Sequence, residues 1–281
     1  MQQFIPFTLA GRVITQPLVM GILNVTPDSF YAGSRCDTPM AIEARVGQML
    51  DEGVDIIDIG ACSTRPGAAV VTAREEMARL SRALEVVHRM APHMLTSVDT
   101  FRADVARHAV EQLGVGIVND VSGGTLDPQM FATVAHLQVP YVLMHMRGTP
   151  ATMQQLTDYD NVVDDVLCDL RGKLDFLRGM GGRDVVVDPG FGFAKTVQQN
   201  YDLMARLEEF HTLNAPLLVG ISRKSMIYNV LNCTPGEALN GTTVLNTVAL
   251  LAGAHILRVH DVRPAVEART LLKLMNNNNE Q

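Results

Sequence analysis

Short apolar runs alternate with segments of helical periodicity along almost the whole chain. The runs are rich in Val, Ile and Leu and lack a regular polar alternation, which is typical of parallel strands buried on both faces. Polar residues or glycine follow the runs directly. On this pattern eight strands are predicted, at residues 19–23, 55–60, 95–100, 116–120, 141–146, 185–190, 216–222 and 256–261.

Apolar residues at helical spacing fill the intervals between these runs. Thr38 and Pro39 provide a helix cap and a first-turn proline, and Gly53 ends the helix that they begin. Thr72, with Glu75 three residues later, predicts a capping box at the start of the next helix. Further helices are predicted at residues 131–137, 162–177, 203–210, 239–251 and 264–275.

This repeated order of strand and helix predicts an α/β protein built as a single (β/α)₈ TIM barrel. Eight such units in about 260 residues match the usual size of that barrel. We expect the barrel to span residues 18–275, after a hairpin extension at 1–17 and before a frayed tail at 276–281. An open, doubly wound sheet is the alternative, although the glycine fingerprint of a dinucleotide site is missing after the first strand.

The composition narrows the class of protein. The chain has 281 residues, 47% of them hydrophobic and 19% charged, and its net charge of -7 argues against a nucleic-acid surface. Neither a signal peptide nor a membrane span is predicted, because the amino terminus is not basic and polar residues interrupt the longest apolar run, 244–257. Cys36, Cys62, Cys168 and Cys233 show no zinc-like spacing, so we expect free thiols and a cytoplasmic location.

Polar residues gather where the predicted strands end. In a barrel these ends meet at one face, where the loops over a rigid floor carry the chemistry. So many buried polar groups imply a ligand or mutual pairing, since each costs about 1 to 3 kcal/mol when unpartnered. The residues concerned are Asn24, Asp58, Asp99, Asn119, His145, Met146, Asp188, Ser222, Arg223, Lys224, Arg258 and His260.

Plainer interpretations exist for some of these groups. Asp58 and Asp120 are interpreted equally well as helix caps, and His145 and Met146 are more often ordinary core residues. Asp188 is a better site candidate. It follows three valines and opens PGFGF, whose glycines allow close backbone approach and whose phenylalanines offer apolar walls.

Single basic residues at apolar strand ends predict a phosphate or pyrophosphate site. Arg223 and Lys224 follow the seventh strand, and Arg258 and His260 lie on the eighth, where this architecture commonly binds phosphate. Arg65 in STRPG adds a guanidinium that suits phosphate oxygens. A Schiff-base lysine at Lys224 is the alternative, but no acid-base partner for it is evident.

Eight motifs carry a resemblance to a known family. In chain order they are MGILNVTPDSF, STRPGA, SVDT, IVND, LMHM, DPGFGF, GISRKSM and RVHDV. With these motifs the chain resembles the dihydropteroate synthases of the bacterial folate pathway over essentially its whole length.

The resemblance implies a transferase. Members of the family condense 6-hydroxymethyl-7,8-dihydropterin pyrophosphate with 4-aminobenzoate, and they release pyrophosphate and 7,8-dihydropteroate. It also implies that Mg²⁺ is the cofactor, that the partners are small-molecule substrates rather than nucleic acid or membrane, that the protein is a homodimer, and that sulfonamides compete with aminobenzoate.

The resemblance also assigns roles to residues. The implied catalytic residues are Arg65, Lys224, Arg258 and His260. The implied pterin-binding residues are Asp99, Asn119, Met146, Asp188, Phe193, Lys224 and Arg258. Pyrophosphate would be held by Asn24, Arg65, Arg258 and His260, with Asn24 also on the metal. Aminobenzoate would be held by Phe30, Ser63, Thr64, Pro66 and Ser225.

Two loops depart from the family pattern. The family usually has SDGG after Phe30, where this chain has Tyr31 and Ala32, and usually GGESTRPG where this chain has Ala61 and Cys62. Their effect on rate and inhibitor affinity stays open. So do three other interpretations: a pterin-binding methyltransferase domain, a non-catalytic pterin-binding homologue, and an unrelated lyase that uses Lys224.

Overall fold

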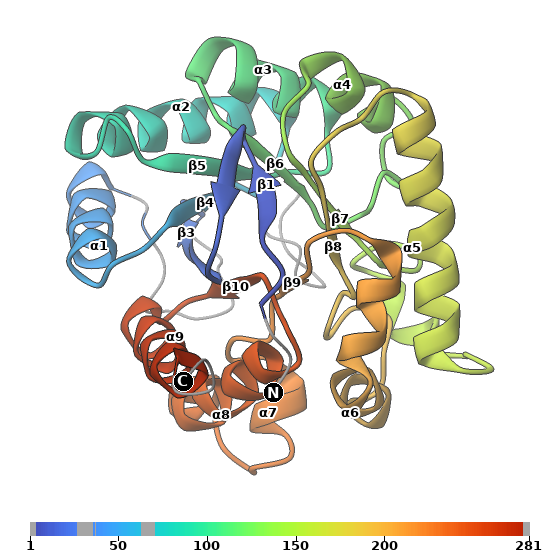
Figure 1. Ribbon diagram of the computed structural model, residues 1–281. Coiled ribbons are helices and arrows are strands. Elements are labelled where there is room, and N and C mark those ends of the chain that lie inside the picture. Colours follow the sequence, from blue (N-terminus) through green and yellow to red (C-terminus); the bar gives the residue numbers. More distant parts are fainter. Residues whose placement is uncertain (1–3, 27–35, 37, 63–70, 278–281) are drawn as a thin grey trace.

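The fold is a ring of parallel strands surrounded by helices (Figure 1). The structure, a computed structural model, describes residues 4–26, 36, 38–62 and 71–277. Within them the strands lie in the order β8-β7-β6-β5-β4-β3-β10-β9. Their bounds are β3 (Leu18–Asn24), β4 (Ile56–Gly60), β5 (Leu95–Asp99), β6 (Ile117–Asp120), β7 (Tyr141–Met144), β8 (Val185–Asp188), β9 (Leu218–Val219) and β10 (Ile256–Val259).

The ring closes between β8 and the residues that lead into β9. Val187 forms a parallel bridge with Leu217, and the Val187 N–H donates to the Pro216 carbonyl at 2.8 Å. This closure excludes the open, doubly wound sheet and confirms the predicted (β/α)₈ barrel. The predicted hairpin is also present, as β1 (Phe7–Leu9) paired antiparallel with β2 (Arg12–Ile14).

Helices cover the outside of the ring (Figure 1). They are α1 (Pro39–Asp51), α2 (Ala73–Met90), α3 (Ala103–Leu113), α4 (Met130–Leu137), α5 (Val162–Gly179), α6 (Val197–Ala205), α7 (Ser225–Tyr228), α8 (Leu239–Leu251) and α9 (Val262–Asn277). Short 3₁₀ turns are η2 (Met153–Gln155), η3 (Leu207–Leu213) and η4 (Pro235–Glu237). No helix in the described ranges combines the length and the hydropathy needed to cross a membrane.

Three local predictions change. The helix predicted at 203–210 is wrong: the capping box of Thr196 and Gln199 starts α6 earlier, and the chain tightens into η3 after Ala205. At α2 only half of the predicted box forms, because Thr72 accepts from the Glu75 N–H while the Glu75 carboxylate pairs with Arg79. Helix α9 continues through residue 277, two residues into the segment predicted to fray; residues 278–281 lie outside the described residues.

The interior of the ring is apolar near the amino ends of the strands and polar near their carboxyl ends. Alternate strand residues point inward. The lower inward side chains form one buried cluster, closed from beneath by Leu9 of the hairpin: Leu9, Leu18, Met20, Ile56, Ile117, Val142, Val186, Leu218 and Ile256. Two residues further along several strands the inward position is polar, as in Asp58, Asn119 and Arg258. The strand pattern therefore concentrates polar groups at the carboxyl end of the ring.

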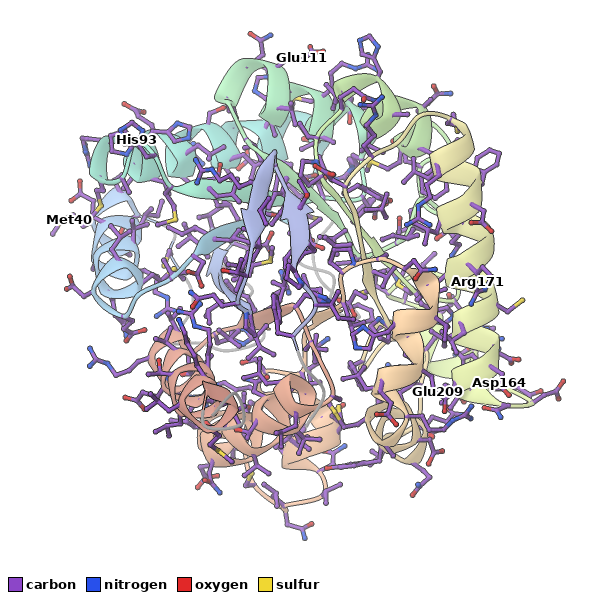
Figure 2. The ribbon with its side chains drawn as sticks, viewed as in Figure 1. Met40, His93, Glu111, Asp164, Arg171 and Glu209 are labelled. Carbon is purple, nitrogen blue, oxygen red and sulfur yellow. The ribbon has the colours of Figure 1, made fainter. Side chains whose placement is uncertain are left out.

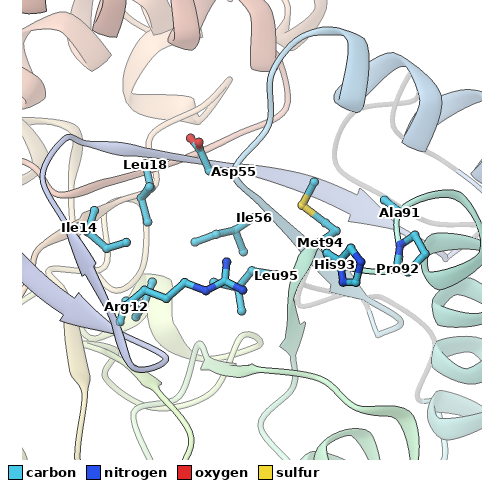
Figure 3. A pocket seen from close by; sticks show the side chains of 11 residues that line it. Arg12, Ile14, Leu18, Asp55, Ile56, Ala91, Pro92, His93, Met94 and Leu95 are labelled. Atoms are coloured by element: carbon cyan, nitrogen blue, oxygen red, sulfur yellow. The ribbon is translucent and has the colours of Figure 1, made fainter.

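A cleft of about 470 Å³ lies at the opposite end, between the hairpin and the turn after α2 (Figure 3). Leu9, Leu18 and Ile56 form part of its lining. The Asp55 carboxylate in this cleft already accepts hydrogen bonds from the Val19 N–H and from Arg269. The cleft is therefore mainly apolar and lies away from the polar end of the barrel.

Arg223 fastens the segment between β9 and α7. It has a positive φ of 54°, which costs a non-glycine residue about 1 kcal/mol or more. Its Nε and Nη2 donate to Asp261 at 2.8 and 3.0 Å, and its Nη1 donates to the carbonyls of Pro235 and Gly236 at 2.7 and 2.6 Å. The side chain is only 5% exposed, so these bonds hold the segment in its strained conformation.

We expect Arg223→Met to lower the free energy of unfolding by about 3 to 5 kcal/mol, because it leaves the Asp261 carboxylate and two carbonyls without their donor. Urea unfolding measures the change. Arg206→Met is the control, since Arg206 pairs with Asp164 and Glu209 on the outer surface (Figure 2). Equal shifts of the two unfolding midpoints would contradict a fastening role for Arg223.

Candidate active site

The centre of the polar end is an ion cluster around Arg258. Its Nε donates to Asp58 Oδ2 at 2.7 Å, and its Nη2 donates to Asp99 Oδ2 at 2.6 Å. The Asn119 side chain adds a donor to Asp58 Oδ2 at 3.1 Å. Strands β4, β5, β6 and β10 each supply one member of this cluster, so it spans the ring.

The electrostatics of this cluster leave it rich in acceptors. Burial raises the pKa of Asp99, while the neighbouring Arg258 works against that rise. Burial also works against the charge of Arg258, but Asp58 and Asp99 outweigh it and raise the guanidinium pKa. One cation thus faces two acids, and Asp58 Oδ1 and Ser97 Oγ are buried without a protein partner among the described residues. These two atoms suit a ligand or a water that brings hydrogen-bond donors.

Asp188 and Lys224 form a second polar pair. The Gly190 N–H donates to Asp188 Oδ1 at 2.7 Å, and Lys224 Nζ donates to the Phe191 carbonyl at 2.6 Å. A Cβ atom on Gly220 would lie 3.9 Å from Asp188 Oδ2 and 4.0 Å from Lys224 Nζ. The bare glycine therefore leaves space between an acceptor and a donor.

Burial sets the proton affinities of this pair. It raises the pKa of Asp188, against the opposing charge of Lys224 and the Gly190 N–H. It lowers the pKa of Lys224 to about 8, with Asp188 working against that shift. At neutral pH Lys224 is thus still mainly an ammonium group, but one whose proton is held less tightly than in water.

Met146 and Phe193 belong to the same group of apolar side chains. Met146 belongs to a small buried apolar cluster with Val121, Met144, Met153 and Ala194, and Phe193 packs against it. The Lys224 ammonium lies 4.7 Å from the centre of the Phe193 ring. The polar pair is therefore bordered by the flat ring of Phe193, which suits a planar ligand with a polar edge.

The anion side is only partly assembled from described residues. A Cβ atom on Gly60 would lie 3.3 Å from Asn24 Oδ1 and 3.7 Å from Asp99 Oδ2, so both polar groups border Gly60. His260 Nδ1 lies 3.0 Å from the Ser222 hydroxyl, and burial, then Arg258, lowers the pKa of His260 to about 3. His260 is thus a neutral hydrogen-bonding group here. Ser225 is half-buried and begins α7.

Some predicted site residues cannot be placed. Phe30, Tyr31 and Ala32, as well as Ser63, Thr64, Arg65 and Pro66, lie outside the described residues. The grouping of Arg223 with Lys224 as phosphate-binding residues is wrong for Arg223, whose guanidinium is held by Asp261 and two carbonyls. The two residues are consecutive in sequence, but Arg223 serves the fold.

The surroundings of Cys62 favour a passive rather than a reactive thiol. The thiol is half-buried, and burial raises its pKa, as does the nearby Glu76; Arg102 opposes the rise. A reactive cysteine needs a lowered pKa. The raised pKa therefore favours an inert thiol at this departure from the family pattern.

Sequence reasoning missed the partner of Asp58 and the buried Lys195, and it left the role of Asp120 open. Asp58 was visible at a strand end, but its pairing with Arg258 across the ring has no local signal. Asp120, the other suspected cap, accepts from the N–H groups of Ser122 and Gly124 and thus holds the loop after β6. Lys195 was not considered, yet the residue is 3% exposed and its Nζ donates a hydrogen bond to the Gly190 carbonyl, two residues after Asp188.

No set of three or more His, Cys, Asp or Glu side chains in residues 4–26, 36, 38–62 and 71–277 is arranged to hold a metal ion. Asn24 Oδ1 and Asp99 Oδ2, which both border Gly60, are oxygen atoms of the kind that magnesium prefers.

Comparison with known proteins shows similarity in sequence and in fold. The family model described as "Pterin binding enzyme" matches residues 20–260. The chain is 40% identical to dihydropteroate synthase of Escherichia coli K12 over 262 residues, 92% of either protein. The structure of Yersinia pestis dihydropteroate synthase with a sulfonamide drug complex superposes with a TM-score of 0.89 at 35% identity, covering 98% of this chain and 100% of that one. The Xanthomonas albilineans dihydropteroate synthase with 4-aminobenzoic acid gives a TM-score of 0.86 at 38% identity, covering 96% and 98%.

We expect His260 to remain neutral between about pH 5 and pH 8 in the ligand-free protein. Burial and the nearby Arg258 both disfavour the imidazolium form, so the folded protein takes up this proton only near pH 3. The unfolded chain takes it up below about pH 6.5, and the stability from neutral His260 is therefore lost as the pH falls below that value. Imidazole ¹⁵N shifts, assigned with His260→Gln, measure the state; a midpoint near pH 6.5 would contradict the expectation.

Proposed function

The chain belongs to the dihydropteroate synthase family of pterin-binding enzymes, and from that membership we propose that it condenses 6-hydroxymethyl-7,8-dihydropterin pyrophosphate with 4-aminobenzoate to give 7,8-dihydropteroate and pyrophosphate. It is thus a transferase of folate biosynthesis. The observation that carries this proposal is the Asp188–Lys224 pair, whose polar atoms border Gly220 and which lies next to the Phe193 ring.

The pterin ring fits this arrangement edge by edge. The Asp188 carboxylate accepts from the 2-amino group and the adjacent ring N–H, because its two oxygens match two neighbouring donors. Lys224 donates to the ring carbonyl and a ring nitrogen. Asn119 and Asp99 contact the remaining polar edge, where the unpartnered Asp58 Oδ1 offers a further acceptor. Met146 and Phe193 cover the ring faces, and the Arg258 guanidinium supplies a planar cation beside them.

The reaction needs positioning and charge rather than a covalent enzyme intermediate. The bond between the pterin methylene carbon and the pyrophosphate oxygen breaks first, and its electron pair leaves with pyrophosphate. The aminobenzoate nitrogen then attacks the cationic methylene and loses one proton. Arg65, Arg258, Lys224 and His260 are the proposed catalytic residues, of which Arg65, Arg258 and His260 hold the leaving group with Asn24. Neutral His260 contributes a hydrogen bond there rather than a charge.

We assign aminobenzoate to the mouth of the barrel, near Ser225 at the start of α7. Phe30, Ser63, Thr64 and Pro66 complete that assignment by family resemblance. A sulfonamide has the same flat ring with an amino group at one end and an anionic group at the other. Sulfonamides are therefore expected to compete with aminobenzoate for the same place.

Mg²⁺ is proposed as the cofactor. Asn24 offers an amide oxygen that borders Gly60, and the described residues hold no cluster of three or more His, Cys, Asp or Glu ligands; this suits a metal bound mainly by phosphate oxygens with one protein oxygen. When bound, the ion would neutralise the charge of departing pyrophosphate. Replacing Asn24 by Ala should raise the Mg²⁺ concentration needed for half-maximal turnover, and an unchanged requirement would remove Asn24 from this role.

The protein is proposed to act in the cytoplasm. Its cysteines at positions 36, 62, 168 and 233 are all free, which suits a reducing compartment. Cell fractionation followed by detection of the protein checks this location.

For the main proposal we expect purified protein to release pyrophosphate only when both substrates and Mg²⁺ are supplied. Asp188→Ala should lower kcat/KM for the pterin substrate by at least about a hundredfold, since it removes a charged acceptor from the buried ring edge. Asp202→Ala, on helix α6, serves as a carboxylate control. Full activity in Asp188→Ala would contradict the pterin assignment, whereas pterin binding without turnover in the unaltered protein would identify a non-catalytic homologue.

We also propose that the protein is a homodimer and that helices α8 and α9, which pack together, form its interface. Each helix exposes apolar residues: Val244 and Val248 on α8 are 54% and 39% exposed, and Leu271 and Leu274 on α9 are 63% and 60% exposed. Apolar residues gathered on neighbouring helices mark a contact surface.

Sedimentation equilibrium is expected to give twice the mass of the chain, and Val248→Glu with Leu274→Glu to give a monomer, because burying two uncompensated charges opposes association. A substituted protein that keeps the mass of the unaltered one would place the interface elsewhere.

A further inference from the structure

The Asp188 loop, residues 189–194, encloses a buried lysine that the proposed chemistry does not use. The Lys195 side chain is 3% exposed, and its Nζ donates to the carbonyls of Gly190 and Phe193, both at 3.0 Å. His145 Nδ1 lies at 3.0 Å from the same Nζ. All three hydrogen-bonding directions of the amine are therefore occupied, two of them by the backbone of one loop.

This loop lies directly against the end of β7. A Cβ atom on Gly190, whose φ is 72°, would lie only 2.0 Å from the His145 carbonyl oxygen and 3.4 Å from Lys195 Nζ. A glycine is therefore required there, and the loop has no room to move towards β7. Lys195 holds the loop in this close contact by bonding both to it and to His145.

The groups that Lys195 holds border the proposed pterin site. Gly190 donates its N–H to Asp188 Oδ1, and Phe193 is one of the apolar walls. His145 immediately precedes Met146, the other wall. The Lys195 amine is thus linked through its neighbours to the Asp188 carboxylate and to both apolar walls, Phe193 and Met146. It does not itself contact the surfaces that would touch the pterin ring.

We propose that Lys195 is a positioning residue of the pterin site, which fixes the Asp188 loop against the end of β7 and thereby sets the distance between Asp188, Phe193 and Met146. The proposal rests on the proposed function for the identity of the ring. It adds a residue that acts only through its neighbours.

The hydrogen bonds of Lys195 hold in either protonation state. Burial lowers its pKa to about 7, with Asp188 and Asp169 opposing the shift and Lys224 and Arg147 adding to it. Burial, then the charge of Lys195, lowers the pKa of His145 to about 2, so this imidazole is neutral with one N–H to place. As an ammonium group Lys195 donates to His145 Nδ1. As an amine it keeps both bonds to the loop carbonyls and accepts from a protonated Nδ1 instead.

Lys195→Met is the direct test, because methionine fills a similar volume without a donor. We expect KM for the pterin substrate to rise at least about tenfold while KM for aminobenzoate stays within about twofold. Titration calorimetry with 6-hydroxymethylpterin alone should show the same loss of affinity. Two controls apply: Lys273→Met, a lysine on α9 bonded to Gln16, and Tyr159→Phe, which removes the hydroxyl donor to the Ala194 carbonyl of the same loop.

A double-mutant cycle with His145→Leu examines the link to β7. We expect the pterin affinity of Lys195→Met/His145→Leu to equal that of Lys195→Met alone, because both changes break one contact. Additive losses would overturn the link.

The remaining outcomes also decide the proposal. Lys195→Met leaves the Gly190 and Phe193 carbonyls without their donor, so a lower Tm is expected, and thermal unfolding checks that the variant is still folded at the assay temperature. Unchanged pterin affinity in a folded Lys195→Met variant overturns the proposal, as does an equal loss for both substrates with a lowered Tm, which would mark a merely structural lysine. Failure of the unaltered protein to release pyrophosphate while it still binds 6-hydroxymethylpterin would count against the proposed reaction and leave the role of Lys195 measurable by calorimetry.

Discussion

The ion cluster of Arg258 with Asp58 and Asp99 is the interaction on which the carboxyl end of the barrel depends. Charges at such depth are tolerated only when they are paired and hydrogen-bonded, and here the cation comes from β10 while the acids come from β4 and β5. The strands around the ring must keep their register for these groups to meet. The same few side chains therefore help to fix the order of the strands and prepare the site for a ligand.

The cluster also explains why the site has a defined polarity before any substrate binds. Two acids share one guanidinium, and Asp58 Oδ1 and Ser97 Oγ remain without partners among the described residues. The cost of removing these groups from water is met during folding. A ring that brings hydrogen-bond donors therefore gains hydrogen bonds without a further desolvation cost for the protein. The Asp188–Lys224 pair extends this preorganisation to the other side of Gly220. The fold thus holds these groups in positions complementary to a flat, polar ring before the ring binds.

Much of this arrangement could be predicted from the sequence because strand ends are local features. Asp188 after three valines and Arg258 two residues before His260 are recognisable from period and polarity alone, and the closed barrel follows from the repeated order of elements. Pairing across the ring is not local, so the partner of Arg258 could not be identified. Arg223 shows the opposite failure. Its place in the sequence grouped it with Lys224 at a phosphate site, but its guanidinium binds Asp261. Lys195 lies in a loop without periodicity, where burial gives no signal in the sequence.

The hairpin of β1 and β2 affects the route by which small molecules can reach the interior of the barrel. Leu9 packs against a layer of aliphatic side chains that fills the lower end of the ring, so no passage leads through the barrel from that end. In the proposed function the pterin substrate contacts Asn119 and Asp188 above this layer, so the substrate would enter, and the product would leave, at the same carboxyl end of the ring.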